Sequence, residues 1–519
     1  MVLNWHYNKK IIEMERIYNN KLFCFFGLIV VLCMTFSCSE DFFDTKIGDR
    51  IFPDQHFNNS IDVELTYLGV TSLLQEILPN YIVVDGLLSD QMEVTQSADV
   101  DMRNIYDHNV LLSNPFIDGS GYYKVIISAN DALKHIDQVV EKDRNYDTLD
   151  NKSYRAALIG YRSWAYFNYV RLYGEAALIP DEMSSISGTS GLPMISRIDM
   201  LDTLINHLTP YIHDNESQIE EIFVFNSINT KALLGEIYLE KGDYEKAAEL
   251  LKAAVESYGN SPTMYKVDRT YGMEDYANLF INSFANVTAV MAAVPFSFEE
   301  GQKNPLEDYF GYNNSYMIAP TKNIIDSFDL QIQQTDGIGD IYRGRGVNFD
   351  TVPGTGDTEY YISKYSLDES VLYSADIILY RSADLHLLLA EALNRTGESE
   401  LAMTLLNNGM SELSPRPEGY VRWGRNVGIR GRVFLKARTV PESAADPMIY
   451  REDLIIQERA LELAFEGKRW FDLMRIARRR NDPSYLADKV AAKFSDPVMA
   501  EQVRSWLMNE ANWYLPVAR

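Results

Sequence analysis

A segment near the middle of the chain spaces small and large residues in a way that few folds can satisfy. Between Thr230 and Ser257, small residues recur where two helices would cross closely, and larger residues stand between them. This spacing matches a tetratricopeptide unit, which is a pair of antiparallel helices with large side chains in the groove between them. The segment therefore predicts a helical hairpin. The matching positions are Leu234, Gly235, Tyr238, Gly242, Tyr244, Ala247, Leu251 and Ala254.

A second, degenerate copy of this unit lies between Leu385 and Met410. Apolar residues at helical spacing predict further helices over 61–78, 122–140 and 154–173, the last of them ending at Gly174. Two copies do not make a regular solenoid, but stacked helix pairs are the expected scaffold. The predicted fold is therefore mainly α, with tetratricopeptide-like helix pairs at 230–257 and 385–410.

The region between the two copies has a different composition. From about Asn260 to Ala375 the chain is dense in Gly, Asn, Asp, Tyr and Pro. Such residues favour turns, and long irregular insertions on a rigid scaffold often carry binding sites. We expect a loop-rich insertion over about 260–375.

The N-terminus predicts an exported protein. The apolar run from Leu22 to Phe36 follows four basic residues, and its fifteen residues at about 1.5 Å each fall short of the roughly 30 Å hydrocarbon core of a membrane. A basic region, a short apolar region and then the small residue Ser37 are typical of a signal peptide. We expect a signal peptide over 1–37 and a single body over 38–519. Either Met1 or Met14 is the start.

Cys38 stands where a bacterial lipoprotein carries its lipid. The sequence before it, Thr35-Phe36-Ser37, resembles the usual lipoprotein pattern but lacks the aliphatic residue three positions before the cysteine. We expect lipid attachment at Cys38. An uncleaved anchor or an ordinary cleavage nearby is the alternative.

The charge of the chain limits its partners. The net charge is −26, and cleavage before Cys38 would remove four basic and two acidic residues to leave −28. A body this acidic is repelled by nucleic acid and by anionic lipid surfaces. We therefore expect no nucleic-acid partner, and a lipid rather than surface charge would hold the protein at a membrane.

The C-terminal segment 456–473 reads IQERALELAFEGKRWFDL, and we call it the hallmark segment. It predicts one helix ended by Gly467 and a second over 469–479 that turns Trp470, Phe471 and Met474 inward. It resembles, at nearly every position, the ER-x-x-ELAFEG-x-RWFDL pattern of the SusD/RagB family of outer-membrane nutrient-binding lipoproteins. Further segments that resemble this family are 38–44, 123–137, 162–180, 320–328 and 378–394.

The resemblance implies capture of a ligand rather than its conversion. Members of this family lie on the extracellular face of the outer membrane, anchored by lipid. They cover a SusC-like TonB-dependent transporter and hold an oligosaccharide or a peptide between the two proteins. The resemblance therefore implies a surface-exposed protein that binds its ligand without catalysis and without a cofactor.

The residues themselves give little support to an enzyme. The sequence contains no HExxH, GxSxG, P-loop or dinucleotide-binding pattern, and no two of its seven histidines have zinc-ligand spacing. Glu458, Glu462 and Glu466 form a ladder at helical spacing, which is usually an ion-paired or solvated face. Two alternatives stay open. One is an interaction protein or structural lid built on tetratricopeptide helices, and the other is a surface glycoside hydrolase, which needs only two carboxylates.

Two loop-like stretches combine the aromatic, amide and charged groups that bind sugars and extended peptides. The alternative is that these side chains pack the fold, since the chain has 33 tyrosines. The candidate residues are Tyr309, Tyr312, Asn313 and Tyr316 in the first stretch, and Asp90, Gln91, Arg103 and Tyr106 in the second.

Two charged regions admit further roles. The basic stretch Arg416–Arg438 would meet an anionic ligand or an acidic partner, or it folds against the protein's own carboxylates, which we favour. The acidic loops Asp336–Asp340 and Asp350–Asp357 are candidates for a structural calcium ion, although neither has EF-hand spacing.

Overall fold

The computed structural model describes residues 56–181, 183, 191–212, 227–256, 267–268, 272–286, 288–356, 358–367 and 373–517. The expected signal peptide and Cys38 lie outside the described residues. From Asn58 onward the chain forms one compact unit, in which α-helices predominate, and this confirms the predicted fold class. None of the described helices combines the length and apolar character needed to cross a membrane.

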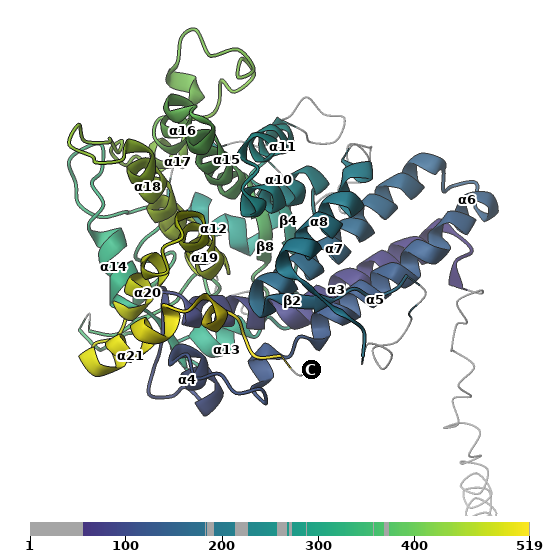
Figure 1. The fold of residues 1–519 in the computed structure, drawn as a ribbon, viewed down its shortest axis with the longest axis horizontal. Helices are drawn as coiled ribbons and strands as arrows, with labels where there is room; N and C mark the ends of the chain where they lie inside the picture. The colour runs from purple at the N-terminus through teal and green to yellow at the C-terminus, as the bar shows by residue number, and fades with distance from the viewer. Residues whose placement is uncertain are drawn as a thin grey trace, which may run out of the picture. The chain divides into compact units, whose positions relative to one another are not determined.

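Three long helices lie side by side at the start of this unit (Figure 1): α3 (Ser60–Leu88), α5 (Ser120–His135) and α7 (Thr148–Tyr173). Both α3 and α7 begin with a capping box, in which an Asn or Asp side chain and an Asp three residues later satisfy each other's backbone N–H groups. As predicted, α7 ends at Gly174, whose φ of +81° is left-handed. The prediction over 61–78 is too short, because α3 continues through Pro79 to Leu88.

The two predicted helix pairs are present. The first consists of α10 (Thr230–Lys241) and α11 (Tyr244–Glu256), and the second of α15 (Ser382–Thr396) and α16 (Ser399–Leu406). A Cβ atom at Gly235 would lie 2.7 Å from the Cγ atom of Leu251, so α10 and α11 cross closely at this glycine. Gly242 and Gly397 end the first helix of each pair in left-handed conformation, with φ of +89° and +93°.

These pairs form part of one continuous helical scaffold. Helix α8 (Arg197–Leu208) packs against both α7 and α10, and α11 packs directly against α15 although the whole insertion separates them in sequence. Figure 1 shows α10, α11 and α15 as neighbours. Helix α15 also packs against α18 (Pro447–Glu462), which carries the first half of the hallmark segment.

Where the structure describes it, the insertion between α11 and α15 contains only short elements. Its helices are α12 (Met273–Ile281), α13 (Leu306–Phe310) and α14 (Lys322–Asp329), and its strands are β4 (Val290–Val294), β5 (Ile318–Pro320), β6 (Asp350–Thr351), β7 (Tyr360–Tyr361) and β8 (Ile377–Arg381). The strands pair antiparallel in two-stranded sheets, β4 with β8 and β6 with β7. Strand β8 continues directly into α15, so the sheet of the insertion is connected to the helical scaffold without an intervening loop.

Shorter elements complete the described fold. Between α3 and α5 lie β1 (Met92–Val94) and α4 (Val100–Tyr106), and β2 (Glu175–Ala177) pairs with β3 (Met194–Ser196) after α7. The predicted helix 122–140 is interrupted after His135 by a 3-10 turn that leads into α6 (Val139–Lys142). The C-terminal part contains α17 (Ile429–Arg432), α18, α19 (Arg469–Arg480), α20 (Ser484–Ala491) and α21 (Pro497–Leu507).

The hallmark segment folds as two helices joined by a turn, but the first helix is shorter than predicted. Helix α18 ends at Glu462 and not at Gly467, so Phe465 lies in the turn with a φ of +64°. Side chains of the insertion donate hydrogen bonds to the backbone carbonyl groups that the end of the helix leaves without partners. The Tyr276 hydroxyl donates to the Glu462 carbonyl (2.6 Å), and the Lys364 ammonium donates to that of Ala464 (2.7 Å). These hydrogen bonds replace the backbone hydrogen bonds that a longer α18 would have made.

Candidate functional site

A short pair of strands brings together the two stretches that carry the predicted ligand residues. Strand β1 pairs antiparallel with β5, with Met92 opposite Pro320 and Val94 opposite Ile318. Just past the strands, the Thr95 N–H donates to the Met317 carbonyl (2.9 Å). The segments after α3 and after α13 therefore meet, although they are far apart in sequence.

A groove with a volume of about 770 Å³ lies beside this strand pair. Its walls are residues 93–97, one face of α14 and residues 358–360, with Tyr316 between them. Sites for small molecules typically have volumes of roughly 300–1,000 Å³. We call this feature the Tyr316 groove and consider it the candidate site.

Tyr316 is held in place from several sides. Its φ of +44° is left-handed, which is rare for a bulky residue and requires support from the surrounding structure. Its hydroxyl donates to the Tyr360 carbonyl (2.7 Å), and its own carbonyl accepts a hydrogen bond from the Thr95 hydroxyl. Burial, together with the smaller effects of the Glu359 and Glu93 carboxylates, raises the pKa of Tyr316 to about 12. The ring is therefore a fixed, neutral part of the groove.

The other candidates from the first stretch do not line the groove. The Tyr312 ring packs against Tyr361 with ring centroids 4.8 Å apart. The Tyr309 ring meets Phe116 edge to face at 5.9 Å, and Asn313 is exposed to solvent.

Asp90 and Gln91 tie the end of α3 to the hallmark segment. The Asp90 carboxylate accepts two hydrogen bonds from the Arg469 guanidinium, at 2.7 and 2.8 Å. The Gln91 amide donates to the Ala460 carbonyl (2.8 Å) and accepts from the Phe465 N–H (3.2 Å). Both residues also face a separate cavity of about 310 Å³ on the other side of α14.

Arg103 and Tyr106 lie outside the groove lining. The Arg103 guanidinium donates to the carbonyl groups of Thr95 and Gln96, at 2.8 and 2.9 Å, and so shapes the turn after β1. The Tyr106 ring lies under the buried Lys493 ammonium, 4.5 Å from its centroid. Arg103 is therefore a positioning residue for the groove wall, whereas Tyr106 packs against residues outside the groove lining.

Several groove residues could not be recognised from the sequence. Glu93 lies within the second candidate stretch, where no local pattern distinguishes it, while Lys322, Asp329, Glu359 and Tyr360 belong to the insertion. The only local signal for the last of these was the Tyr360-Tyr361 pair among turn-forming residues. Which side chains face the groove depends on pairings between distant segments, which the sequence does not display.

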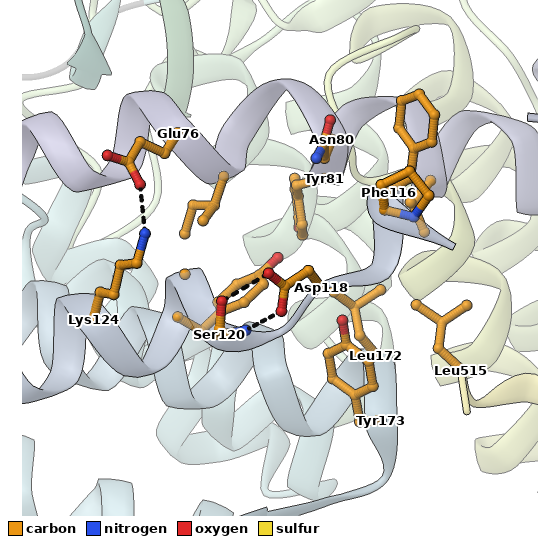
Figure 2. A pocket seen from close by; sticks show the side chains of 15 residues that line it. Glu76, Asn80, Tyr81, Phe116, Asp118, Ser120, Lys124, Leu172, Tyr173 and Leu515 are labelled. Carbon is orange, nitrogen blue, oxygen red and sulfur yellow. Dashed lines mark hydrogen bonds and ion pairs between the residues drawn. The ribbon is translucent and has the colours of Figure 1, made fainter. Parts of the chain in front are cut away.

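A third cavity lies between α3 and α5, but it has a volume of only about 140 Å³. Figure 2 shows Glu76 on α3 and Lys124 on α5 facing each other across it, joined by an ion pair of 3.1 Å. Asp118 binds the Ser120 hydroxyl at 2.8 Å beside them, and Leu515 closes the opposite end. This volume is below the usual range for a small-molecule site. The Tyr316 groove is therefore the stronger candidate.

The glutamates of the hallmark segment belong to a buried ionic cluster. Arg343 is fully buried and binds Glu458 (2.8 Å) and Glu462 (2.7 Å). Burial opposes ionisation of Glu458, but the guanidinium groups of Arg430 and Arg343 outweigh it and lower its pKa to about 2. We define the ionic cluster as Asp340, Arg343, Lys364, Arg381, Arg430, Arg432, Glu458, Glu462 and Glu466.

The cluster explains why the hallmark glutamates are present. They are ion-paired, as predicted, and they are fully enclosed rather than solvated. Their partners come from the insertion, from β8 and from α17, so the cluster fastens these three parts to α18. No hallmark glutamate reaches the Tyr316 groove.

Comparisons with known proteins show which family and which fold the chain resembles. Residues 311–518 match the SusD family. The chain is 22% identical over 494 residues to SusD-like protein P38 of Formosa agariphila, covering 87% of this chain and 90% of that protein. It is 21% identical over 489 residues to SusD-like protein P2 of the same organism, covering 86% and 89%. These matches support assignment of the chain to the SusD/RagB family.

Solved SusD structures share the fold. A SusD superfamily protein from Bacteroides vulgatus has a TM-score of 0.67 at 16% identity, covering 88% of this chain and 95% of that one. A second, from Bacteroides thetaiotaomicron, has a TM-score of 0.64 at 20% identity, covering 89% and 95%. A third, described as a laminarin binding SusD-like protein, has a TM-score of 0.60 at 16% identity, covering 86% and 96%.

The basic stretch Arg416–Arg438 folds largely against the protein's own acidic groups, which agrees with the favoured interpretation. Arg430 and Arg432 belong to the ionic cluster. Arg425 pairs with Asp268 at 2.7 Å, and Lys436 pairs with Asp336. Arg438 binds the side-chain oxygens of Gln457 and Gln331.

The acidic loops considered for calcium are partly engaged in other contacts. Asp336 pairs with Lys436 and Asp340 with Arg343, which removes both carboxylates from a shared cation site. Asp350 accepts a hydrogen bond from the Thr351 N–H, and Asp357 lies outside the described residues. Among the described residues, no group of three or more His, Cys, Asp or Glu side chains is arranged to hold a metal ion.

Proposed function

We propose that this protein binds an oligosaccharide in the Tyr316 groove and delivers it unaltered to a SusC-like TonB-dependent transporter of the outer membrane. Similarity to the SusD family supports the role in nutrient capture. The groove supports the location, because it combines a fixed aromatic side chain with unpaired polar groups in a volume of about 770 Å³. An extended peptide is the alternative ligand.

The observation that carries the proposal is the position of Tyr316. An aromatic ring offers an apolar face to the C–H groups of a sugar ring, while carboxylate and amide groups around it accept or donate to sugar hydroxyls. Gln96 and Glu359 lie in the walls beside Tyr316 and supply such groups. The laminarin binding SusD-like structure makes laminari-oligosaccharides the first probe for this protein.

Replacement of Tyr316 tests the site. We expect Tyr316→Ala to weaken oligosaccharide binding at least tenfold in isothermal titration calorimetry, because the stacking face is lost. Tyr316→Phe keeps that face and should retain binding within a few-fold. Tyr450→Ala is the control, since Tyr450 is exposed on α18 and does not line the groove. Equal binding by wild type and Tyr316→Ala would reject the groove as the site.

The absence of catalysis is part of the proposal. The hallmark glutamates are buried in ion pairs, which argues against their use as glycosidase carboxylates. We expect chromatography to detect only the intact oligosaccharide after prolonged incubation with the protein. A hydrolysis product that also forms with Tyr316→Ala would indicate a contaminant, whereas one that requires Tyr316 would support the hydrolase alternative.

Anchoring through Cys38 is the proposed route to the membrane, after removal of residues 1–37. The support is the N-terminal sequence and the family, since the residues concerned lie outside the described ones. Metabolic labelling with a fatty acid should mark the wild type, and Cys38→Ala should lose the label and leave the membrane fraction. Protease accessibility on intact cells would test the proposed extracellular location.

A structural lid is the second candidate function, and one surface favours it. Four large aliphatic side chains between residues 330 and 341 are exposed, with Leu330 at 75% and Ile338 at 78%. Apolar surface of this kind often marks a protein interface. We expect Ile338→Asp to reduce co-purification with the transporter while oligosaccharide binding persists. If Ile338→Asp abolishes oligosaccharide uptake by cells while Tyr316→Ala leaves uptake intact, the result would favour a structural lid over ligand capture. The four residues are Leu330, Ile332, Ile338 and Ile341.

A further inference from the structure

The charges that line the Tyr316 groove are unbalanced. Its walls carry four carboxylates and a single ammonium group. That ammonium, on Lys322, is already engaged with both carboxylate oxygens of Asp326, at 2.6 Å each. The three carboxylates of Glu93, Asp329 and Glu359 form no hydrogen bond or ion pair with any described residue. A ligand in the groove therefore meets a wall with an excess of negative charge.

Two of these carboxylates influence the aromatic side chain of the groove. Glu359 and Glu93 line the same groove as Tyr316, and both raise the pKa of its hydroxyl in addition to the effect of burial. Glu93 is itself partly buried, and this burial raises its pKa, although the Lys493 ammonium partly compensates. The groove therefore presents Tyr316 together with Glu93, which is partly buried, and Glu359, which is exposed to solvent.

Ionised carboxylates in such a position discriminate between ligands. They accept hydrogen bonds and donate none, so they match the hydroxyl groups of an uncharged sugar. They repel carboxylate and sulfate groups, and the repulsion strengthens where water is partly excluded. Apart from Lys322, none of the described residues lining the groove carries a positive charge to compensate an anionic ligand.

We propose that the Tyr316 groove selects uncharged, hydroxyl-rich oligosaccharides and rejects glycans that carry carboxylate or sulfate groups. This inference rests on the proposed function, since it requires that the groove binds a glycan. It adds a determinant of selectivity, formed by Glu93, Asp329 and Glu359, which we call the carboxylate triad.

The test compares neutral and anionic glycans on one array, with laminari-oligosaccharides and their C6-carboxylated derivatives as a matched pair. We expect the wild type to bind neutral members and to bind the carboxylated member of a bound pair at least tenfold more weakly. Neutralising the carboxylate triad should reduce that difference to a few-fold. The triple variant is Glu93→Gln, Asp329→Asn and Glu359→Gln.

A second triple variant controls for overall charge. It removes the same number of carboxylates from exposed positions on α3, α11 and α16 that do not line the groove, and it should keep the wild-type discrimination. Salt provides an independent measurement that needs no variant. Raising ionic strength from about 0.01 M to about 1 M shortens the Debye length from about 30 Å to about 3 Å, and it should reduce the discrimination. The control variant is Glu64→Gln, Glu245→Gln and Glu400→Gln.

The outcomes separate this inference from the proposed function. If anionic glycans bind as tightly as neutral ones, and Tyr316→Ala abolishes both, the groove binds glycans but the selectivity is overturned. The selectivity is also overturned if the control triple variant and the groove triple variant change discrimination equally. If no glycan binds, or binding ignores Tyr316→Ala, the proposed function itself fails and the inference falls with it.

Discussion

The ionic cluster and the Tyr316 groove are both rich in carboxylates, but the carboxylates differ in their pairing and burial. In the cluster, Glu458 and Glu462 are fully buried, and each binds two or more cationic side chains. In the groove, Glu93 and Glu359 have no such partner among the described residues, and both remain in contact with solvent. The same side-chain chemistry therefore serves structure in one region and is left available for a ligand in the other.

The difference follows from the cost of removing charge from water. A buried carboxylate without a partner is expensive, so the cluster is stable only because Arg343 and its neighbours neutralise it. At the groove, contact with solvent makes unpaired carboxylates tolerable, and a ligand supplies the missing donors. Pairing and burial, rather than residue type, separate structural from ligand-binding carboxylates in this protein.

The largest expected effect comes from breaking the ionic cluster. Arg343→Met leaves Asp340, Glu458 and Glu462 short of a partner in a buried site, and we expect the free energy of unfolding to fall by about 3–5 kcal/mol. Urea unfolding followed by circular dichroism measures this. Lys322→Met is the control, because its side chain is 81% exposed and its ion pair with Asp326 should be worth at most about 1 kcal/mol. Similar losses in both variants would remove the distinction drawn between the two regions.

Acid should destabilise the protein through the same cluster. The pKa of Glu458 is about 2 in the folded state against 4.5 ordinarily, so the unfolded state binds more protons between these values. Stability that is present above about pH 4.5 is therefore lost as the pH falls through about 2. On its own this group accounts for about 3 kcal/mol. A urea midpoint that stays constant over this range would contradict the paired state of the glutamates.

The smallest expected effect belongs to the groove. Glu359→Gln removes a carboxylate that forms no ion pair or hydrogen bond with a described residue. The free energy of unfolding should therefore change by less than about 0.5 kcal/mol. The same urea titration measures it. A loss above about 2 kcal/mol would mean that Glu359 has a structural role like that of Glu458.

The sequence predicted those parts of the fold that depend on local contacts. Gly235, Leu251 and Gly242 lie within one hairpin, so their spacing alone reveals the crossing and the turn. The structural role of the hallmark glutamates also followed from their helical spacing. Their complete burial did not, because the partners Arg343 and Arg381 come from the insertion and from β8.

The candidate site was predictable only in outline. The sequence identified the two stretches that meet through β1 and β5, and Tyr316 among their residues does line the groove. It could not distinguish Tyr316 from Tyr309 and Tyr312, because all three stand in the same kind of loop sequence. Their different environments arise from contacts with Tyr360, Phe116 and Tyr361, which belong to other segments.

Hydrogen–deuterium exchange with and without a bound neutral oligosaccharide tests the central claim most directly, because it maps the ligand onto both regions in one measurement. The account predicts slower exchange at residues 93–97, 316–329 and 358–360 when the ligand is present, and no change across the hallmark segment. Protection confined to the small cavity between α3 and α5, or to the hallmark segment itself, would contradict it.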